Sequence, residues 1–328
     1  MKKKIYIWCS NLDTFSGEGI LANKFISDLK KKNPYFKYHT KSPNKKKLNI
    51  TKIVLGSNYD RFYIPFHGII YLWLVYFSKK DKKLCFVNYL PLWNFFIFLF
   101  LPPNTILGPI TGGSQYYKKP IINYFIRNYV FKFFYKISFL IIRMRFKKAL
   151  FSTDLLRNKI DNKGFYFNYI LKDLVFKKYN INKKFDIVFY LKDHHNKNTN
   201  LQVDLANQLA KKYRIVTVGK KTNNKLIKEF GFISRKKIKK ILMRTKFAFL
   251  STENIMSLFS LDCFQSNTYI IYDKKNIQKN YLINCSFKID YDDNKKLFNM
   301  IDKLIKNYKS PKKFSVKEIN NFDNYFKI

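Results

Sequence analysis

The second half of the chain alternates between short apolar runs and amphipathic stretches, and this alternation constrains the fold more than any other feature. The strand candidates lie at residues 186–191, 214–218, 247–250 and 268–272. The helix candidates lie at residues 201–212, at 236–244, from about 257, and at about 294–308. Strands that alternate with helices in this way indicate a parallel sheet with helices on both faces.

The first half shows the same alternation less regularly. It opens with the apolar run KIYIWCS, a loop that contains Gly17 and Gly19, and a helical pattern that ends in lysines, which suit a helix carboxyl terminus. Further strand candidates lie at residues 51–56, 84–88 and 105–108. The first half therefore also predicts a βαβ domain.

A chain of 328 residues is long enough for two domains of ordinary size. We expect the boundary near residues 165–185, and we assign residues 1–170 to the first domain and 171–328 to the second. The end of the chain, from residue 310 on, is polar, and we expect it to form a helix or a loosely held tail.

The net charge is +43 at pH 7, and so strong a positive field attracts polyanions whatever the fold. Only eight of the 64 basic residues are Arg, which argues against a dedicated reader of nucleic-acid sequence. Abundant Lys, Asn, Ile, Phe and Tyr is also what an A/T-rich coding sequence produces. Charge alone therefore names no partner, and a non-catalytic basic protein that binds nucleic acid or anionic membrane stays an alternative.

Cysteine spacing and hydropathy indicate a cytoplasmic location. The four cysteines are widely separated, with no C-x-x-C pair to suggest zinc or thiol redox chemistry, so we expect reduced core residues. The amino terminus, MKKKIYIWCSNLD, has too short an apolar run for a signal peptide. No run reaches the roughly 18 to 20 apolar residues that a membrane-spanning helix needs, so we predict none.

A basic aromatic helix is expected at residues 121–150. Lys132, Lys136, Arg143 and Lys147 would form one stripe about 60° wide on it, while most other positions are aromatic or aliphatic. This pattern is typical of a helix at a membrane interface, with lysines facing anionic lipid. A core helix of a large domain that exposes one polar edge has the same pattern, so both interpretations stay open.

Polar residues follow two strands of the expected second domain. Lys192 and Lys197 come directly after the strand at 186–191, where cations can hold a phosphate group because ligands of parallel α/β sheets bind at the carboxyl ends of strands. After the strand at 247–250, Glu253 precedes a helix that Ser257 would cap. A helix start favours anions such as a diphosphate, and Asp262 in that helix could accept hydrogen bonds from ribose.

In this order the motifs resemble the glycosyltransferases of the GT-B fold, in particular the large retaining family 4. That family has an Arg and a Lys five positions apart that hold the donor diphosphate, and Lys192 and Lys197 match that spacing. Its Glu-x7-Glu motif is matched by Asp262 in the second place. Eight residues separate Glu253 from Asp262, not seven, so either Glu253 or Asn254 takes the first place, beside the donor sugar.

The resemblance extends to the glycines. The strand that ends at Gly219 matches a family strand ending in Gly, and SGEG, with Gly17 and Gly19, resembles the glycine loop after the first strand. GPITGG, with Gly112 and Gly113, resembles a loop that faces the cleft in some family members. These glycines, together with Asn254, Ser257 and Asp262, are the residues that the resemblance assigns to ligand binding.

The resemblance implies two Rossmann-like domains facing across a cleft. It also implies transfer of a sugar from a nucleotide diphosphate sugar to a saccharide or lipid-linked acceptor, with retention, without metal and with no cofactor beyond the donor. Lys192, Lys197 and Glu253 would act in catalysis. We expect a role in surface polysaccharide or lipopolysaccharide assembly, at the inner face of the cell membrane, with the anionic membrane surface as a partner and no specific nucleic acid.

A different glycosyltransferase fold, GT-A, uses an Asp-x-Asp pair to hold a divalent metal, and Asp290-Tyr291-Asp292 has that form. The pair stands directly before the helix expected from Asn294, where acidic residues complement the helix dipole. We therefore interpret these carboxylates as a helix cap.

Overall fold

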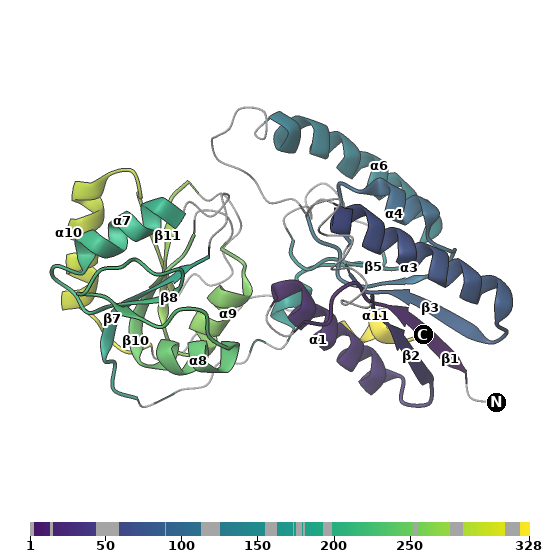
Figure 1. Cartoon of the computed structure of the whole chain (residues 1–328), viewed down its shortest axis with the longest axis horizontal. Coiled ribbons are helices and arrows are strands. Elements are labelled where there is room, and N and C mark those ends of the chain that lie inside the picture. The colour runs from purple at the N-terminus through teal and green to yellow at the C-terminus, as the bar shows by residue number, and fades with distance from the viewer. Residues whose placement is uncertain are drawn as a thin grey trace. The chain divides into compact units, whose positions relative to one another are not determined.

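The computed structural model describes residues 3–13, 16–43, 59–88, 90–112, 125–154, 163–172, 174, 179, 181–192, 199–251, 255–275, 285–311 and 322–328, without the side chains of 59–62 and 127. The chain divides into two compact units. Unit 1 comprises Met1–Lys172 and Asn320–Ile328, and unit 2 comprises Asp173–Ile319. Both are layered α/β structures built on a parallel sheet (Figure 1).

Unit 1 has a four-stranded parallel sheet in the order β2-β1-β3-β4. The strands are β1 (Lys4–Trp8), β2 (Lys37–Lys41), β3 (Lys82–Phe86) and β4 (Ile106–Leu107). A separate two-stranded sheet pairs β5 (Ala149–Leu150) with β6 (Phe165–Tyr166). The strand expected at residues 51–56 lies outside the described residues, and the polar edge strand β2 was not predicted.

Successive side chains of β1 point to opposite faces of the sheet, so the core of unit 1 has two layers. Ile5 and Ile7 point to the face covered by α1 (Gly17–Lys32) and the carboxyl-terminal α11 (Asp323–Phe326). Tyr6 and Trp8 point to the other face, whose core includes residues of three further helices. These helices are α3 (Tyr59–Ser78), α4 (Phe95–Phe100) and α6 (Phe131–Arg145), the last preceded by the π-helical turn η1 (Ile126–Val130).

The last residues of the chain belong to unit 1, which differs from the predicted second domain of residues 171–328. Of the two expected forms, a helix or a loosely held tail, the described residues form a short helix, α11. Phe322, Tyr325 and Phe326 are buried against α1 and the 3-10 turn η3 (Tyr169–Leu171). The hydroxyl of Tyr325 donates to the carbonyl of Leu107 in β4. Buried aromatic side chains therefore hold the carboxyl terminus in the first unit's core.

The basic aromatic helix ends earlier than predicted, at Arg145. Arg145 donates to the carbonyls of Phe98 and Leu101 at 2.9 and 2.7 Å and so supplies hydrogen bonds to backbone carbonyls at the carboxyl end of α4. Lys132, Lys136 and Arg143 are exposed, as the predicted stripe requires, and Lys147 lies beyond the helix. Among the described residues, no helix combines the length and the apolar character needed to cross a bilayer.

Unit 2 has a six-stranded parallel sheet in the order β12-β11-β10-β7-β8-β9. The strands are β7 (Phe185–Leu191), β8 (Ile215–Gly219), β9 (Lys228–Glu229), β10 (Thr245–Phe249), β11 (Tyr269–Asp273) and β12 (Ser286–Ile289). The helices are α7 (Thr199–Leu209), α8 (Arg235–Met243), α9 (Leu258–Gln265) and α10 (Asn294–Lys306). The predicted alternation of strands and helices is confirmed in this unit.

Candidate functional site

The strand order of unit 2 reverses beside β7. The chain runs from β7 to β8 and β9 on one side, then returns to β10 on the other side of β7. The strands β7 and β10 pair in parallel, with Phe189 opposite Phe249, so their carboxyl ends meet at one edge. Ligands of open α/β sheets bind at this kind of edge, because the loops after the two strands separate and leave room between them.

Lys192, predicted to hold a diphosphate, leaves β7 at this edge and is exposed. Its carbonyl accepts a hydrogen bond of 2.7 Å from the hydroxyl of Thr199, the first residue of α7. This bond holds together the two ends of the loop that carries Lys197. Lys197 itself lies outside the described residues.

The loop after β10 leads to the predicted helix start. Ser257 caps α9, since its hydroxyl accepts a hydrogen bond of 3.2 Å from the amide of Ser260, and this predicted cap is confirmed. Glu253 and Asn254 lie outside the described residues. The start of α9 therefore follows one of the two strands at which the order reverses, and its dipole favours an anion there.

Asp262 is almost completely buried in α9, and its carboxylate is held by two cations of α8. Arg235 donates from Nε and Nη2 to the two carboxylate oxygens at 2.6 and 2.7 Å, and Lys239 lies 3.1 Å from one of them. A ribose hydroxyl bound to Asp262 would have to share an oxygen with Arg235. The role in ribose binding stays a prediction, while the ion pair joins α8 to α9.

Sequence reasoning missed this pair, although a signal was available. Arg235 and Lys239 are four residues apart in α8 and so share one face, although the helix was predicted to begin one residue later, at Lys236. Asp262 is the only acidic residue of α9. A basic face and a lone acidic residue on neighbouring helices are the pattern that an interhelical ion pair produces.

Gly219 ends β8 beside the end of β7, and its position explains the residue type. Its φ of +102° is strained for other residues, and a Cβ would lie 2.0 Å from the carbonyl oxygen of Leu191. Its amide donates to the carbonyl of Gly231 at 2.8 Å. The glycine thus allows close approach of two strand ends, and its contact with a ligand stays a prediction.

In unit 1 the order reverses beside β1, and the predicted glycine loop follows that strand. Ser16 caps α1 by accepting from the amide of Gly19 at 3.0 Å. Gly17 is exposed, whereas Gly19 is buried, and a Cβ there would lie 1.9 Å from the carbonyl oxygen of Asp13. The loop is therefore packed tightly on the first turn of α1.

Asn88, which sequence reasoning missed, fixes this loop to the end of β3. Its Oδ1 accepts from the amide of Asn11 at 3.1 Å and from the thiol of Cys9 at 3.0 Å, and its Nδ2 donates to the carbonyl of Asn11 at 2.9 Å. Burial raises the pKa of Cys9 to about 12, so the thiol keeps the proton that it donates.

The second predicted loop of unit 1 is only partly described. Gly112 has a φ of +147°, and a Cβ there would lie 3.0 Å from the Cβ of Leu92. Gly113 lies outside the described residues. The ligand-binding role of both glycines stays a prediction.

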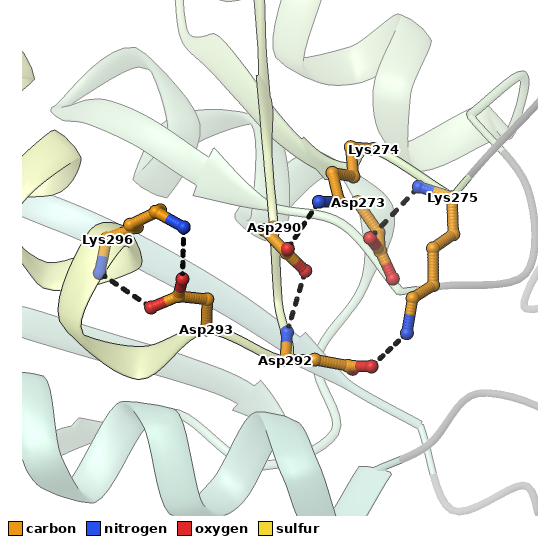
Figure 2. A network of polar contacts seen from close by, with 7 residues as sticks. All are labelled: Asp273, Lys274, Lys275, Asp290, Asp292, Asp293 and Lys296. Atoms are coloured by element: carbon orange, nitrogen blue, oxygen red, sulfur yellow. Dashed lines mark hydrogen bonds and ion pairs between the residues drawn. The ribbon is translucent and has the colours of Figure 1, made fainter.

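The Asp-x-Asp motif has lysine partners (Figure 2). Asp290 pairs with Lys274 at 2.5 Å, and Asp292 pairs with Lys275. Asp293 accepts from the amide of Lys296 at 3.0 Å and caps α10. The cap is therefore formed by the residue after the motif, and not by Asp290 or Asp292, to which the sequence interpretation assigned it. Within the part of the chain that the structure describes, no group of three or more His, Cys, Asp or Glu could hold a metal ion.

Comparisons with known proteins give likenesses of structure only. No family model and no curated protein sequence matches the chain. Among solved structures, UDP-GlcNAc 2-epimerase of Methanocaldococcus jannaschii, in complex with UDP-GlcNAc and UDP, has 11% identity and a TM-score of 0.54 over 98% of this chain and 97% of that one. Anabaena HepE in complex with UDP has 9% identity and a TM-score of 0.50, over 93% of this chain and 90% of HepE.

TarM matches 73% of this chain with 15% identity and a TM-score of 0.49, and the chain spans about half, 51%, of TarM. At such low identity the epimerase and HepE establish the fold and not the activity. The epimerase and HepE match along nearly their whole length, across both units. The chain therefore has the GT-B fold of two Rossmann-like domains that the sequence resemblance predicted, and membership of family 4 stays a prediction.

Proposed function

We propose that the protein is a glycosyltransferase that moves a sugar from a nucleotide diphosphate sugar to a saccharide or lipid-linked acceptor. One observation carries the proposal. The polar segments that the sequence assigned to the donor follow β7 and β10, the two strands at which the order of unit 2 reverses. This is the ligand-binding edge of an open α/β sheet, and the fold is one on which solved relatives bind UDP.

The proposed chemistry centres on the departing diphosphate. Lys192 and Lys197 neutralise its growing negative charge, which is where electrostatic stabilisation lowers a barrier most. The start of α9 adds the partial positive charge of a helix dipole. Glu253 or Asn254 orients the donor sugar, and transfer proceeds with retention and without a metal. The product is a surface polysaccharide or lipopolysaccharide, made at the inner face of the cell membrane.

The test is release of nucleoside diphosphate from a panel of nucleotide sugars, with and without mixed saccharide and lipid-linked acceptors. We first select a donor by thermal stabilisation, because a bound ligand raises stability by mass action. Lys197→Ala is expected to lower turnover by about a hundredfold or more, the range for loss of one group that stabilises charge in a transition state. The matched control is Lys211→Ala, an exposed lysine after α7, which should leave turnover unchanged. Equal turnover in the two variants would remove the assignment of Lys197.

A second candidate is an epimerase that acts on the nucleotide sugar itself, because the likeness to UDP-GlcNAc 2-epimerase covers nearly all of both chains. The same panel separates the two activities. An epimerase converts one nucleotide sugar into another without any acceptor, whereas a transferase releases nucleoside diphosphate and depends on an acceptor. Steep, salt-dependent binding of RNA with no binding of any nucleotide sugar would instead favour the non-catalytic basic protein.

A further inference from the structure

The outer helices of unit 1 expose large apolar side chains on the faces that point away from the sheet. On α3 these residues share one stripe about 80° wide, since they recur at helical spacing. They are Tyr63, Phe66, Ile70, Leu74 and Phe77. The opposite side of the same helix packs on the sheet through Ile69, Leu72 and Val75. The helix is thus apolar on both sides, and among the described residues the side that bears Ile69, Leu72 and Val75 is the one packed in the core.

The neighbouring helices continue this stripe. Phe66 of α3 lies 6.5 Å from Phe100 of α4, ring to ring, and Trp73 donates to the carbonyl of Phe100 at 2.7 Å. Figure 1 shows α3, α4 and α6 side by side on one face of the sheet. The exposed apolar residues on α4, η1 and α6 are Phe96, Leu99, Phe100, Phe125, Tyr129, Phe133, Leu140 and Met144. We call these residues and the α3 stripe the outer apolar face.

The size of this face exceeds what a monomeric protein ordinarily exposes to water. Large aromatic side chains carry roughly 150–250 Å² each, and these residues are about half exposed. The face therefore presents on the order of 1,000 Å² of apolar surface, against roughly 300–600 Å² for the largest patch of a typical monomer. A surface of this size indicates a binding partner.

The charge around the face identifies the chemistry of the partner. Residues 61–80, 95–100 and 125–147 contain no Asp or Glu. Lys132, Lys136 and Arg143 form an exposed stripe beside the apolar stripe of α6, and Lys79 and Lys80 follow Phe77 at the end of α3. A wide apolar surface with a basic margin complements acyl chains below anionic headgroups. Two copies of the face would instead bring their lysines together.

We propose that the outer apolar face binds the headgroup and upper acyl region of an anionic lipid bilayer. The side chains of α3, α4 and α6 enter the interface, and the lysines on the margin meet the headgroup phosphates. The proposed function includes a location at the membrane, and this proposal names the surface that would bind there. It does not depend on sugar transfer. A chain held in this way draws a lipid-linked acceptor from the plane of the bilayer.

The test is sedimentation of the full chain with vesicles of phosphatidylcholine, and with vesicles of an equal mixture of phosphatidylcholine and phosphatidylglycerol. The variant Leu74→Gln/Phe77→Gln changes two side chains that are 63% and 77% exposed on α3. The matched control, Leu226→Gln/Phe232→Gln, changes two of similar exposure, 62% and 78%, in unit 2. We expect binding to the anionic vesicles, weaker by about tenfold or more in the α3 variant and unchanged in the control.

The basic margin has its own variant, Lys132→Gln/Lys136→Gln, which should weaken binding to the anionic vesicles and reduce its dependence on salt. Equal vesicle binding by the α3 variant and the control would overturn the proposal. A wild-type dimer that the α3 variant converts to a monomer would identify a self-association surface and overturn it too. A lowered unfolding temperature of the α3 variant would show that a segment of the chain covers the face, and this result would also overturn the proposal.

Thermal stabilisation by nucleotide sugars, measured on the same variants, separates this proposal from the proposed function. The α3 variant should keep that stabilisation, because its substitutions lie on unit 1 and the expected donor edge lies on unit 2. Vesicle binding without nucleotide-sugar binding would support the lipid surface while removing the glycosyltransferase. Nucleotide-sugar binding without vesicle binding would support the glycosyltransferase and overturn the lipid surface.

Discussion

The outward helix surfaces of the two units differ, although both come from one lysine-rich and aromatic-rich chain. In unit 1, α3, α4 and α6 expose apolar side chains as large as Phe77 and Met144. In unit 2, α8 and α10 bury their apolar side chains and expose lysines, and Met300 is the only large apolar residue exposed on a helix among the described residues of this unit.

This difference shows whether coding bias alone can explain the exposed apolar residues of unit 1. A bias toward Lys, Phe, Ile and Tyr codons would act on both units alike, yet the described helices of unit 2 expose mainly lysines where those of unit 1 expose aromatic and aliphatic side chains. The apolar exterior of unit 1 therefore needs an explanation other than composition. In unit 2 the notable features are internal, such as the buried carboxylate of Asp262, paired with Arg235, and the close approach at Gly219.

The largest expected effect concerns the carboxyl terminus. Deletion of residues 322–328 removes three buried aromatic side chains from unit 1, each of which costs about 3–5 kcal/mol when truncated to Ala. We expect unit 1 to unfold while unit 2 keeps its own transition, which hydrogen exchange followed by mass spectrometry can resolve by segment. The control is Ile328→Ala, at a partly exposed position. Loss of protection in unit 2 instead of unit 1 would contradict the assignment of this segment.

Gly219→Ala should destabilise unit 2 by about 2–4 kcal/mol, because the residue combines a positive φ with a carbonyl oxygen in the path of a Cβ. Gly231→Ala is the matched control. Its φ is +60°, but nothing lies within 4 Å of a Cβ there, so only the backbone cost of about 1–2 kcal/mol is expected. Urea unfolding measures both, and equal losses would show that the close contact with Leu191 is not what selects glycine.

Arg235→Met tests whether the carboxylate of Asp262 serves the fold or the ligand. Removal of one partner of a buried ion pair costs about 3–5 kcal/mol. Because Arg235 is partly exposed and Lys239 stays in place, we expect about 2 kcal/mol, measured as the unfolding free energy of unit 2. The exposed neighbour Lys237→Met is the control. Weaker nucleotide-sugar binding at unchanged stability would assign the carboxylate to the ligand.

The smallest expected effect is on α3. Leu74→Gln should change the stability of unit 1 by less than about 0.5 kcal/mol, because the side chain is 63% exposed among the described residues. Leu72→Ala, two residues earlier and completely buried, should cost about 2–5 kcal/mol. Thermal unfolding compares them directly. Similar losses in both would mean that Leu74 is covered in the folded protein and that the difference between the units is not real.

The sequence predicted the features that depend on burial along the chain. Four strands of unit 2 (β7, β8, β10 and β11) are largely buried apolar runs, so periodicity and length were enough to find them. The short strands β9 and β12, which are more polar and less buried, were not predicted. The cap at Ser257 was predictable because a capping side chain bonds to an amide only three residues away.

Features that depend on distant partners were not predictable in the same way. The strand β2, KYHTK, is a polar edge strand that only its pairing with β1 defines. The final segment looked like a loose tail because its aromatic residues find their core in elements almost the whole chain length away. Asn88 acts through residues up to 79 positions away, and no local pattern indicates such contacts. Arg235 acts through Asp262, 27 positions away, and its signal is only visible when the two helices are known to be neighbours.

The central claim is that unit 2 binds the donor at the carboxyl ends of β7 and β10. The most direct measurement is a crystal structure of the protein with UDP, the nucleotide bound by the solved relatives. The account predicts the diphosphate at this edge, in contact with Lys192, Lys197 or the amides at the start of α9. A diphosphate bound on unit 1, or at another edge of the sheet of unit 2, would contradict it.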